Sequence, residues 1–122
     1  MTAAAARPWP VELRLKRDER VLEIDFDDGS TFRLAAELLR VESPSAEVKG
    51  HGTGQKVTVP GKASVGLVEA EPVGRYAVRL IFDDGHDTGL YSWDYLHELG
   101  RKQDVLMADY AAEIARLGLS RN

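Results

Sequence analysis

Residues 22–29 read Leu-Glu-Ile-Asp-Phe-Asp-Asp-Gly, and residues 78–85 read Val-Arg-Leu-Ile-Phe-Asp-Asp-Gly. In both stretches every second residue from the first to the phenylalanine is apolar, as a strand with one buried face requires. The Asp-Gly step that ends each stretch favours a tight turn in which glycine adopts a positive φ. Each stretch therefore predicts a strand that runs into a β-hairpin.

Further strands are expected on both sides of these two stretches. Val11, Leu13 and Leu15 alternate with polar residues and so predict a strand before the first hairpin. Residues 31–34 can form the returning strand of that hairpin. The same reasoning predicts strands in the second half of the chain at residues 65–69, 76–82 and 88–91.

Helices are expected after each hairpin. Residues 35–39 predict a short helix, which ends before Pro44 because proline disfavours helical geometry in the preceding residue. Ser92 is well placed as the N-cap of a helix over residues 93–100. Apolar residues at helical spacing predict a longer amphipathic helix that ends near Gly118: Leu106, Tyr110, Ile114 and Leu117.

The two halves of the chain share the order strand, Asp-Asp-Gly turn, strand, helix. This order is consistent with an internal duplication, and equally with two independent uses of the same hairpin chemistry. The expected fold is α+β, with a small, mostly antiparallel sheet built from hairpins and packed against a short helix and a C-terminal helical pair. We expect residues 9–118 to form a single domain, with residues 1–8 and 119–122 as tails.

Composition narrows the classes of function. A net charge of -4 argues against a protein that grips nucleic-acid backbones. The absence of cysteine excludes disulfides, thiolate nucleophiles and cysteine-ligated zinc or iron–sulfur clusters in this chain alone. No apolar run approaches the ~20 residues needed to span a bilayer. We therefore expect a cytoplasmic protein without a membrane or nucleic-acid partner.

The histidines and aspartates suggest one metal site. The glycine-rich stretch from Gly50 to Gln55 lacks the Lys-Ser/Thr pair of a P-loop and is interpreted as a loop that displays His51. A weakly bound iron or zinc ion could be held by His51, His86 and Asp84. The alternative is that both histidines are solvated turn residues, with His97 on a helix surface.

The paired aspartates, at residues 27–28 and 83–84, have two interpretations. With the nearby Asp87 they could hold a hard cation or act as an acid and base pair. Adjacent residues on an extended strand face opposite ways, however, and Asp-Gly already has a backbone reason to occur in a hairpin. The structural interpretation is therefore favoured.

Three aromatic residues near the start of the expected helix form another candidate site. Tyr91, Trp93 and Tyr95 could provide a binding platform, or they could pack in the core. No Ser, His and Asp set lies in the setting of a nucleophile elbow, so an enzyme is not expected. We expect another protein as partner, with no oligomeric state indicated, bound by exposed residues drawn from this set: Gly50, His51, Gly52, Asp83, His86 and Trp93.

Residues 72–100 contain Phe-Asp-Asp-Gly-His followed by Tyr-Ser-Trp-Asp-Tyr-Leu, and Gly-His-Gly lies upstream at residues 50–52. With these motifs the sequence closely resembles the DUF971 family, also called the gamma-butyrobetaine hydroxylase-like N-terminal domain, over about residues 8–117. The resemblance implies a compact α+β domain without chemistry of its own. Related domains precede the catalytic domain of gamma-butyrobetaine and trimethyllysine dioxygenases, or are fused to Mrp-type ATPases linked with iron–sulfur assembly.

The resemblance also implies a comparison at a zinc site. In the hydroxylases this domain carries zinc on a Cys-x-Cys-x-x-Cys run and one histidine, and those positions correspond here to Ser43, Ser45, Val48 and His86. Hydroxyls and an isopropyl group cannot replace thiolates at a structural zinc, so this role is not expected to carry over. The resemblance thus implies a non-catalytic accessory or docking domain linked to iron-dependent or iron–sulfur-related systems. The alternative is a weak metal-binding protein.

Overall fold

The computed structural model describes residues 7–45 and 57–122. The glycine-rich stretch with Gly50, His51 and Gly52 lies outside these residues. In chain order the elements are β1 (Pro10–Lys16), β2 (Val21–Phe26), β3 (Thr31–Ala35), α1 (Ala36–Val41), β4 (Leu67–Val73), β5 (Ala77–Phe82), β6 (Leu90–Ser92) and α3 (Trp93–Arg116).

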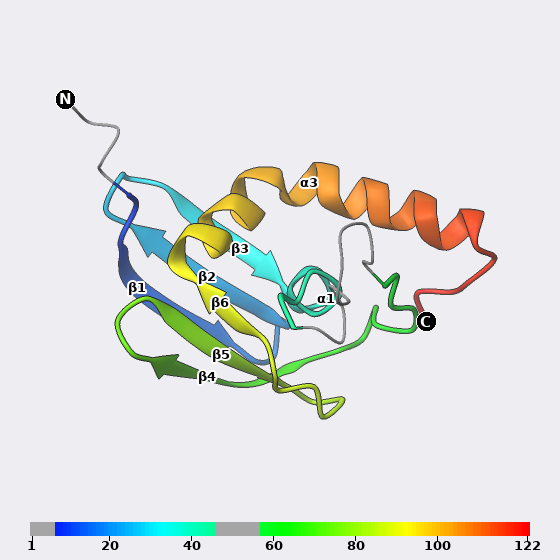
Figure 1. The fold of residues 1–122 in the computed structure, drawn as a ribbon, viewed down its shortest axis with the longest axis horizontal. Helices are drawn as coiled ribbons and strands as arrows, with labels where there is room; N and C mark the ends of the chain where they lie inside the picture. Colours follow the sequence, from blue (N-terminus) through cyan, green and yellow to red (C-terminus); the bar gives the residue numbers. More distant parts are fainter. Residues whose placement is uncertain (1–6, 46–56) are drawn as a thin grey trace.

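The strands form two antiparallel sheets of three strands each, in the orders β1-β2-β3 and β4-β5-β6. The α+β class and the construction from hairpins are confirmed, with two small sheets where one was expected. In Figure 1, α3 runs along the β1-β2-β3 sheet beside β3, and its C-terminal half extends beyond the strands over α1. No helix among the described residues has the length and apolar character needed to cross a membrane.

The two sheets share one hydrophobic core. The central strands β2 and β5 have the same alternating burial, since every second side chain is buried and the intervening ones are partly exposed. The buried side chains of both strands belong to one cluster with residues of α1 and α3: Leu22, Ile24 and Phe26 from β2, and Val78, Leu80 and Phe82 from β5. Burial of a side chain of this size stabilises the fold by about 1.5–3 kcal/mol. The period-two pattern of the sequence thus sets which face of each sheet points inward.

The internal similarity seen in the sequence extends to a three-stranded sheet followed by a helix. Gly29 and Gly85 have φ values of 88° and 91°, and the N–H of each donates to a phenylalanine carbonyl three residues earlier at 3.1 Å. The middle aspartates, Asp28 and Asp84, accept a hydrogen bond from the backbone N–H two residues later at 2.9 and 3.0 Å. Both turns are therefore type I turns closed by a glycine in the left-handed region.

The helix of each half of the chain contacts the hairpin turn of the other half; each half, or repeat, is a three-stranded sheet with the helix that follows it. Arg40 is the fifth residue of α1, and its Nε donates to Asp84 Oδ2 at 2.8 Å. His97 is the fifth residue of α3, and its Nε2 lies 2.9 Å from Asp28 Oδ2. The same position of each helix thus contacts the same aspartate of the opposite turn. The two repeats are interlocked, so neither turn is positioned by its own repeat alone.

The expected pair of C-terminal helices is a single helix of 24 residues, and the break predicted near Gly100 is wrong. Gly100 lies inside α3, where a Cβ atom would come within 2.3 Å of Phe32 Cγ. The glycine permits close packing of α3 on β3 and does not end the helix. His97 is largely covered rather than exposed on the helix surface: its side chain is 13% exposed. Its ring lies 4.9 Å and 5.3 Å, centroid to centroid, from the rings of Phe26 and Phe32.

The end of the chain folds back on the domain. The carbonyls of Ser120 and Arg121 accept hydrogen bonds from the N–H groups of Gly61 and Ala63 at 2.9 and 2.8 Å. The Arg121 guanidinium pairs with the buried Glu37 of α1 at 2.6 Å. Residues 120 and 121, expected to lie in a tail, thus contact residues 61–63 and α1.

Candidate functional site

His86 is buried in the second hairpin turn, with an exposed fraction of 5%. Its Nε2 lies within hydrogen-bond distance, 2.9 Å, of Ser43 Oγ, just beyond the end of α1. The interpretation of His86 as a solvated turn residue is therefore wrong, and the turn 83–87 does not present this ring to the surface. The physical reason is long-range: the chain after α1 packs over the turn and supplies a hydroxyl for the imidazole.

Asp84 lies beside His86 and is neutralised by two cations. Its Oδ2 accepts hydrogen bonds from Arg40 Nε at 2.8 Å and from Lys62 Nζ at 2.6 Å. Burial alone would raise the pKa of this carboxyl, but the bonds from Lys62, from the His86 N–H and from Arg40 outweigh it and lower the pKa well below its ordinary value. This carboxylate is thus ionised and already paired with two cations, which makes it a poor ligand for a further cation.

The three aromatic residues predicted as one group have separate roles. Tyr91 is fully buried and its hydroxyl donates to the Leu39 carbonyl, while the Tyr95 hydroxyl donates to the Glu42 carbonyl. Burial raises the pKa of both phenols, so they remain protonated donors. Trp93, in contrast, lines a surface pocket. The core interpretation holds for the two tyrosines and the platform interpretation survives for the tryptophan.

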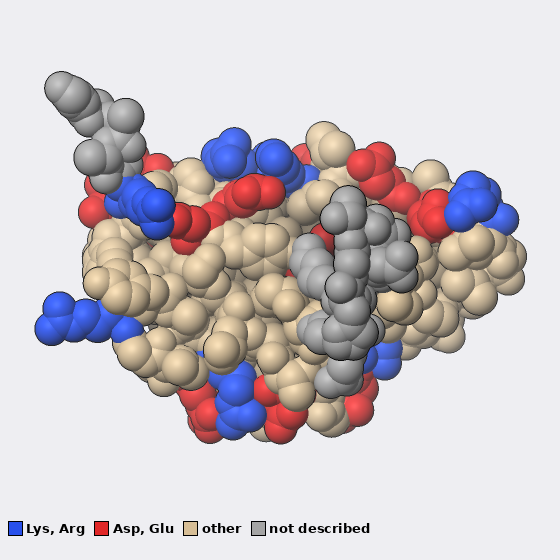
Figure 2. Space-filling model, in the orientation of Figure 1, with Lys and Arg blue, Asp and Glu red and all other residues tan. Residues whose placement is uncertain are grey.

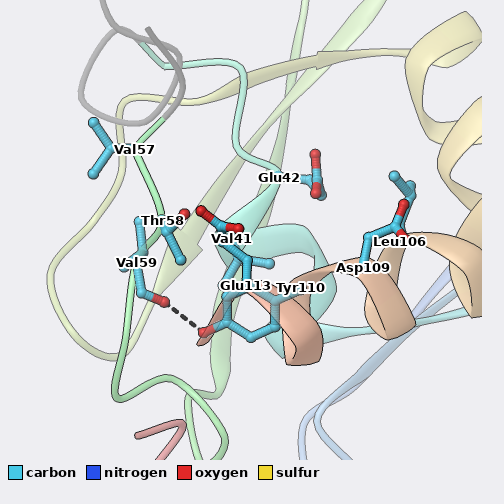
Figure 3. Close-up of a pocket in the computed structure, with 9 residues that line it drawn as sticks. All are labelled: Val41, Glu42, Val57, Thr58, Val59, Leu106, Asp109, Tyr110 and Glu113. Carbon is cyan, nitrogen blue, oxygen red and sulfur yellow. Dashed lines mark hydrogen bonds between the residues drawn. The ribbon is translucent and has the colours of Figure 1, made fainter. Parts of the chain in front are cut away.

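One pocket opens between the end of α1, residues 57–59 and the C-terminal half of α3, with a volume of about 330 Å³. Its apolar part is lined by Val41, Val57, Val59, Leu106 and the ring of Tyr110. Figure 3 shows the Tyr110 hydroxyl bonded to the Val59 carbonyl, which joins one wall of the pocket to the other.

Three carboxylates also line this pocket: Glu42, Asp109 and Glu113. Among residues 7–45 and 57–122, no lysine or arginine lines it. Glu42 follows α1 directly, whereas Asp109 and Glu113 project from α3 (Figure 3). Arg116 pairs with Glu113 at 2.5 Å from outside the lining and lowers the pKa of that carboxyl. The result is an apolar pocket with an acidic lining, the complement of a positively charged group carried on an apolar stem.

The profile of the family described as "Gamma-butyrobetaine hydroxylase-like, N-terminal" matches residues 13–97. The chain belongs to this family. A crystal structure of a protein with unknown function from Acidithiobacillus ferrooxidans, placed in the DUF971 family, is 46% identical and covers 75% of this chain and 91% of that one, with a TM-score of 0.62. The resemblance drawn from residues 72–100 is thereby confirmed.

Two protein structures solved in solution by NMR are also similar to this gamma-butyrobetaine hydroxylase-like N-terminal domain. One is 48% identical, covers 96% of this chain and 92% of that one, and has a TM-score of 0.83. The other is 50% identical, covers 99% of this chain and 90% of that one, and has a TM-score of 0.82. No curated protein gives a significant match. The similar folds thus support the architecture and leave the activity of the domain open to proposal.

The zinc site that the resemblance implies for the hydroxylases does not fit the residues described in this domain. Ser43 Oγ lies 2.9 Å from His86 Nε2, and Ser45 Oγ lies 2.8 Å from the Thr88 hydroxyl. Val48, which corresponds to the third cysteine of the Cys-x-Cys-x-x-Cys run, lies outside the described residues. Neutral hydroxyls are poor zinc ligands compared with thiolates. In this domain hydrogen bonds therefore join the chain after α1 to the second hairpin.

The predicted site residues are only partly brought together. Asp84 and His86 are neighbours in the turn, but both are engaged with other groups of the domain, and His51 lies in the stretch that the structure does not describe. Within residues 7–45 and 57–122 no group of three or more His, Asp or Glu side chains is arranged to hold a metal. Sequence reasoning missed the pocket at Tyr110, since its walls come from three separate segments, residues 41–42, 57–59 and 106–113, which share no motif.

Proposed function

We propose that the domain is a non-catalytic docking domain that binds a basic segment of another protein in the acidic pocket between α1, residues 57–59 and α3. The observation that carries this proposal is the described lining of that pocket, which combines five apolar or aromatic side chains with three carboxylates. A lysine or arginine side chain can place its methylene stem on such a floor and its charge among the carboxylates.

The proposed partner belongs to an iron-dependent or iron–sulfur-related system. This part rests on membership of the gamma-butyrobetaine hydroxylase-like N-terminal family, whose related domains accompany proteins of those systems. The satisfied state of the polar groups near the turn supports a docking role over a catalytic one. Asp84 is neutralised, and the buried tyrosines donate to backbone carbonyls.

Charge reversal in the pocket tests this function. In affinity capture from native cells, the Asp109→Lys variant is expected to retain at most about one tenth of a partner held by the wild type, because a like charge then faces the partner's cation. Asp104→Lys is the matched control, because Asp104 is also exposed on α3 but does not line the pocket. Quantitative mass spectrometry of the captured proteins measures the ratio.

The captured protein must then be shown to bind through a basic segment. Synthetic peptides that cover its sequence are titrated against the three forms of the domain. Peptides with lysine or arginine that bind the wild type and Asp104→Lys alike, and Asp109→Lys at least about tenfold more weakly, support the proposal. Equal binding to all three forms, or binding only of acidic peptides, contradicts it.

We propose as the alternative a weak metal-binding protein that uses His51, His86 and Asp84. A metal there would have to take His86 from Ser43 and compete with Lys62 and Arg40 for Asp84, so the expected affinity is low. Iron and zinc are titrated into the tag-free protein and into the His51→Ala/His86→Ala double variant. The alternative expects uptake by the wild type and at least a tenfold loss in the variant, whereas equal uptake contradicts it.

A further inference from the structure

A second pocket, at the opposite end of α3 from the acidic one, has walls of aromatic rings. Trp9 before β1, Tyr76 before β5 and Trp93 at the start of α3 line a cavity of about 190 Å³. The remaining lining residues are Arg7, Pro8, Ser92 and Asp94. A drug-sized ligand requires roughly 300–1,000 Å³, so a cavity of this size suits a single side chain.

The aromatic walls are held in place although they are partly open to solvent. Trp9 and Tyr76 meet edge to face, with ring centroids 6.0 Å apart. The Trp93 indole N–H donates to the Arg75 carbonyl at 2.7 Å, and the Trp9 backbone N–H donates to Asp27 at 2.9 Å. Tyr76 nevertheless keeps an exposed fraction of 69%. Anchored aromatic rings that stay exposed provide a preformed binding surface.

The chain itself supplies a cation to the lining of this pocket, Arg7. Arg7 Nη1 lies 3.0 Å from Asp94 Oδ2, and the Arg7 side chain is 79% exposed. An ion pair this exposed contributes little to stability, so its guanidinium can be exchanged for another. Figure 2 shows that the neighbouring surface over β6 carries no charged side chains. The charged side chains of this face lie above and below it. The carboxylate of Asp94 is thus the charge that a ligand would find beside the rings.

We propose that this aromatic pocket binds an arginine side chain of another protein and that Arg7 occupies it in competition. A guanidinium is attracted to the faces of tryptophan and tyrosine rings and pairs with a carboxylate through two parallel N–H groups. The planar guanidinium suits flat ring walls better than the compact ammonium of lysine. This inference does not depend on the acidic pocket, because it uses other residues.

The test uses N-acetyl-arginine methylamide as the probe, titrated into the full chain and followed through the indole N–H signals of Trp9 and Trp93. The Arg7→Ala variant removes the competing guanidinium and is expected to bind the probe at least about threefold more tightly than the wild type. The control is the neutral isostere of the probe, N-acetyl-citrulline methylamide. It is expected to bind the Arg7→Ala variant at least tenfold more weakly than the arginine probe does.

Further variants distinguish loss of binding from loss of folding, and this pocket from the acidic one. In the Arg7→Ala background, Asp94→Asn and Tyr76→Ala are each expected to weaken probe binding at least tenfold while the folded spectrum persists. Asp109→Lys, in the other pocket, is expected to leave probe binding unchanged. Unaltered affinity in Arg7→Ala, or equal binding of the arginine and citrulline probes, overturns the proposal.

Discussion

Asp84→Asn is expected to lower the free energy of unfolding by about 2–4 kcal/mol, because it leaves two cations without their carboxylate. Asp84 Oδ2 accepts from both Arg40 and Lys62, and the three side chains have exposed fractions of only 12% to 20%. Asparagine keeps the shape and the backbone bond to the His86 N–H, but it cannot neutralise the guanidinium and the ammonium. Urea denaturation at pH 7 measures the loss.

Asp28→Asn is the matched control that the internal repeat provides. Asp28 occupies the same position of the first turn and likewise accepts a hydrogen bond from the backbone N–H two residues later. Its side chain is 41% exposed, and its helical partner is His97 and no arginine. We therefore expect a much smaller loss of stability for this variant. Equal losses in the two turns would contradict the role assigned to the Arg40 and Lys62 cations.

The pH dependence of the same variant gives a second measurement. Since the pKa of Asp84 is lower in the folded state than its ordinary 3.8, its contribution to stability is complete above pH 3.8 and is lost as the pH falls towards the folded-state value. The stability difference between the wild type and Asp84→Asn should therefore shrink as the pH is lowered from 4 to about 2. A difference that stays constant over this range would show that the charge of Asp84 is not its cause.

Gly100→Ala is expected to destabilise the domain by about 1–3 kcal/mol, although alanine is the better helix former. In an exposed helix the same change stabilises by up to about 1 kcal/mol, so the sign of the effect is informative. Here the added Cβ would lie 2.3 to 2.6 Å from three atoms of the Phe32 ring, near the point where the ring joins its own Cβ. Neither α3 nor β3 can accommodate it without moving. Thermal and urea denaturation measure the change.

Removal of the opposing ring tests the cause of that effect. In the Phe32→Ala background the ring atoms that oppose the new Cβ are gone, so Gly100→Ala should be neutral or stabilising there. In the double variant the effects of the two substitutions on the free energy of unfolding should then not add, and the double variant should be more stable than their sum predicts. If Gly100→Ala is as stable as the wild type when Phe32 is present, the close approach of α3 to β3 is not tight enough to matter.

The sequence by itself determined the local structure. The alternation in β2 and β5 identified the buried face of each sheet, and the Asp-Asp-Gly turns were predicted because only glycine adopts a positive φ without steric cost. Ser92 was predicted as an N-cap, and its hydroxyl accepts from the Tyr95 N–H at 3.1 Å. These features depend on residues a few positions apart, so the local sequence is sufficient to predict them.

The candidate sites were predicted only in part. Trp93 was expected at a binding surface and does line a pocket, but Trp9 and Tyr76, which complete it, stand 84 and 17 residues away in the sequence and carry no shared motif. His86 was expected in an exposed turn and is buried against Ser43, 43 residues earlier. No local pattern reports such an approach between distant segments.

Tertiary structure alone decided which glycine ends a helix and which permits packing, and which aspartate is neutralised. Gly100 lies inside α3 because β3 passes close to it, and Asp84 differs from Asp28 because Arg40 and Lys62 converge on it from elsewhere in the chain. The physical reason is the same in each case. Packing free energy and electrostatic interactions depend on distances in space, whereas backbone preferences act between neighbours in sequence.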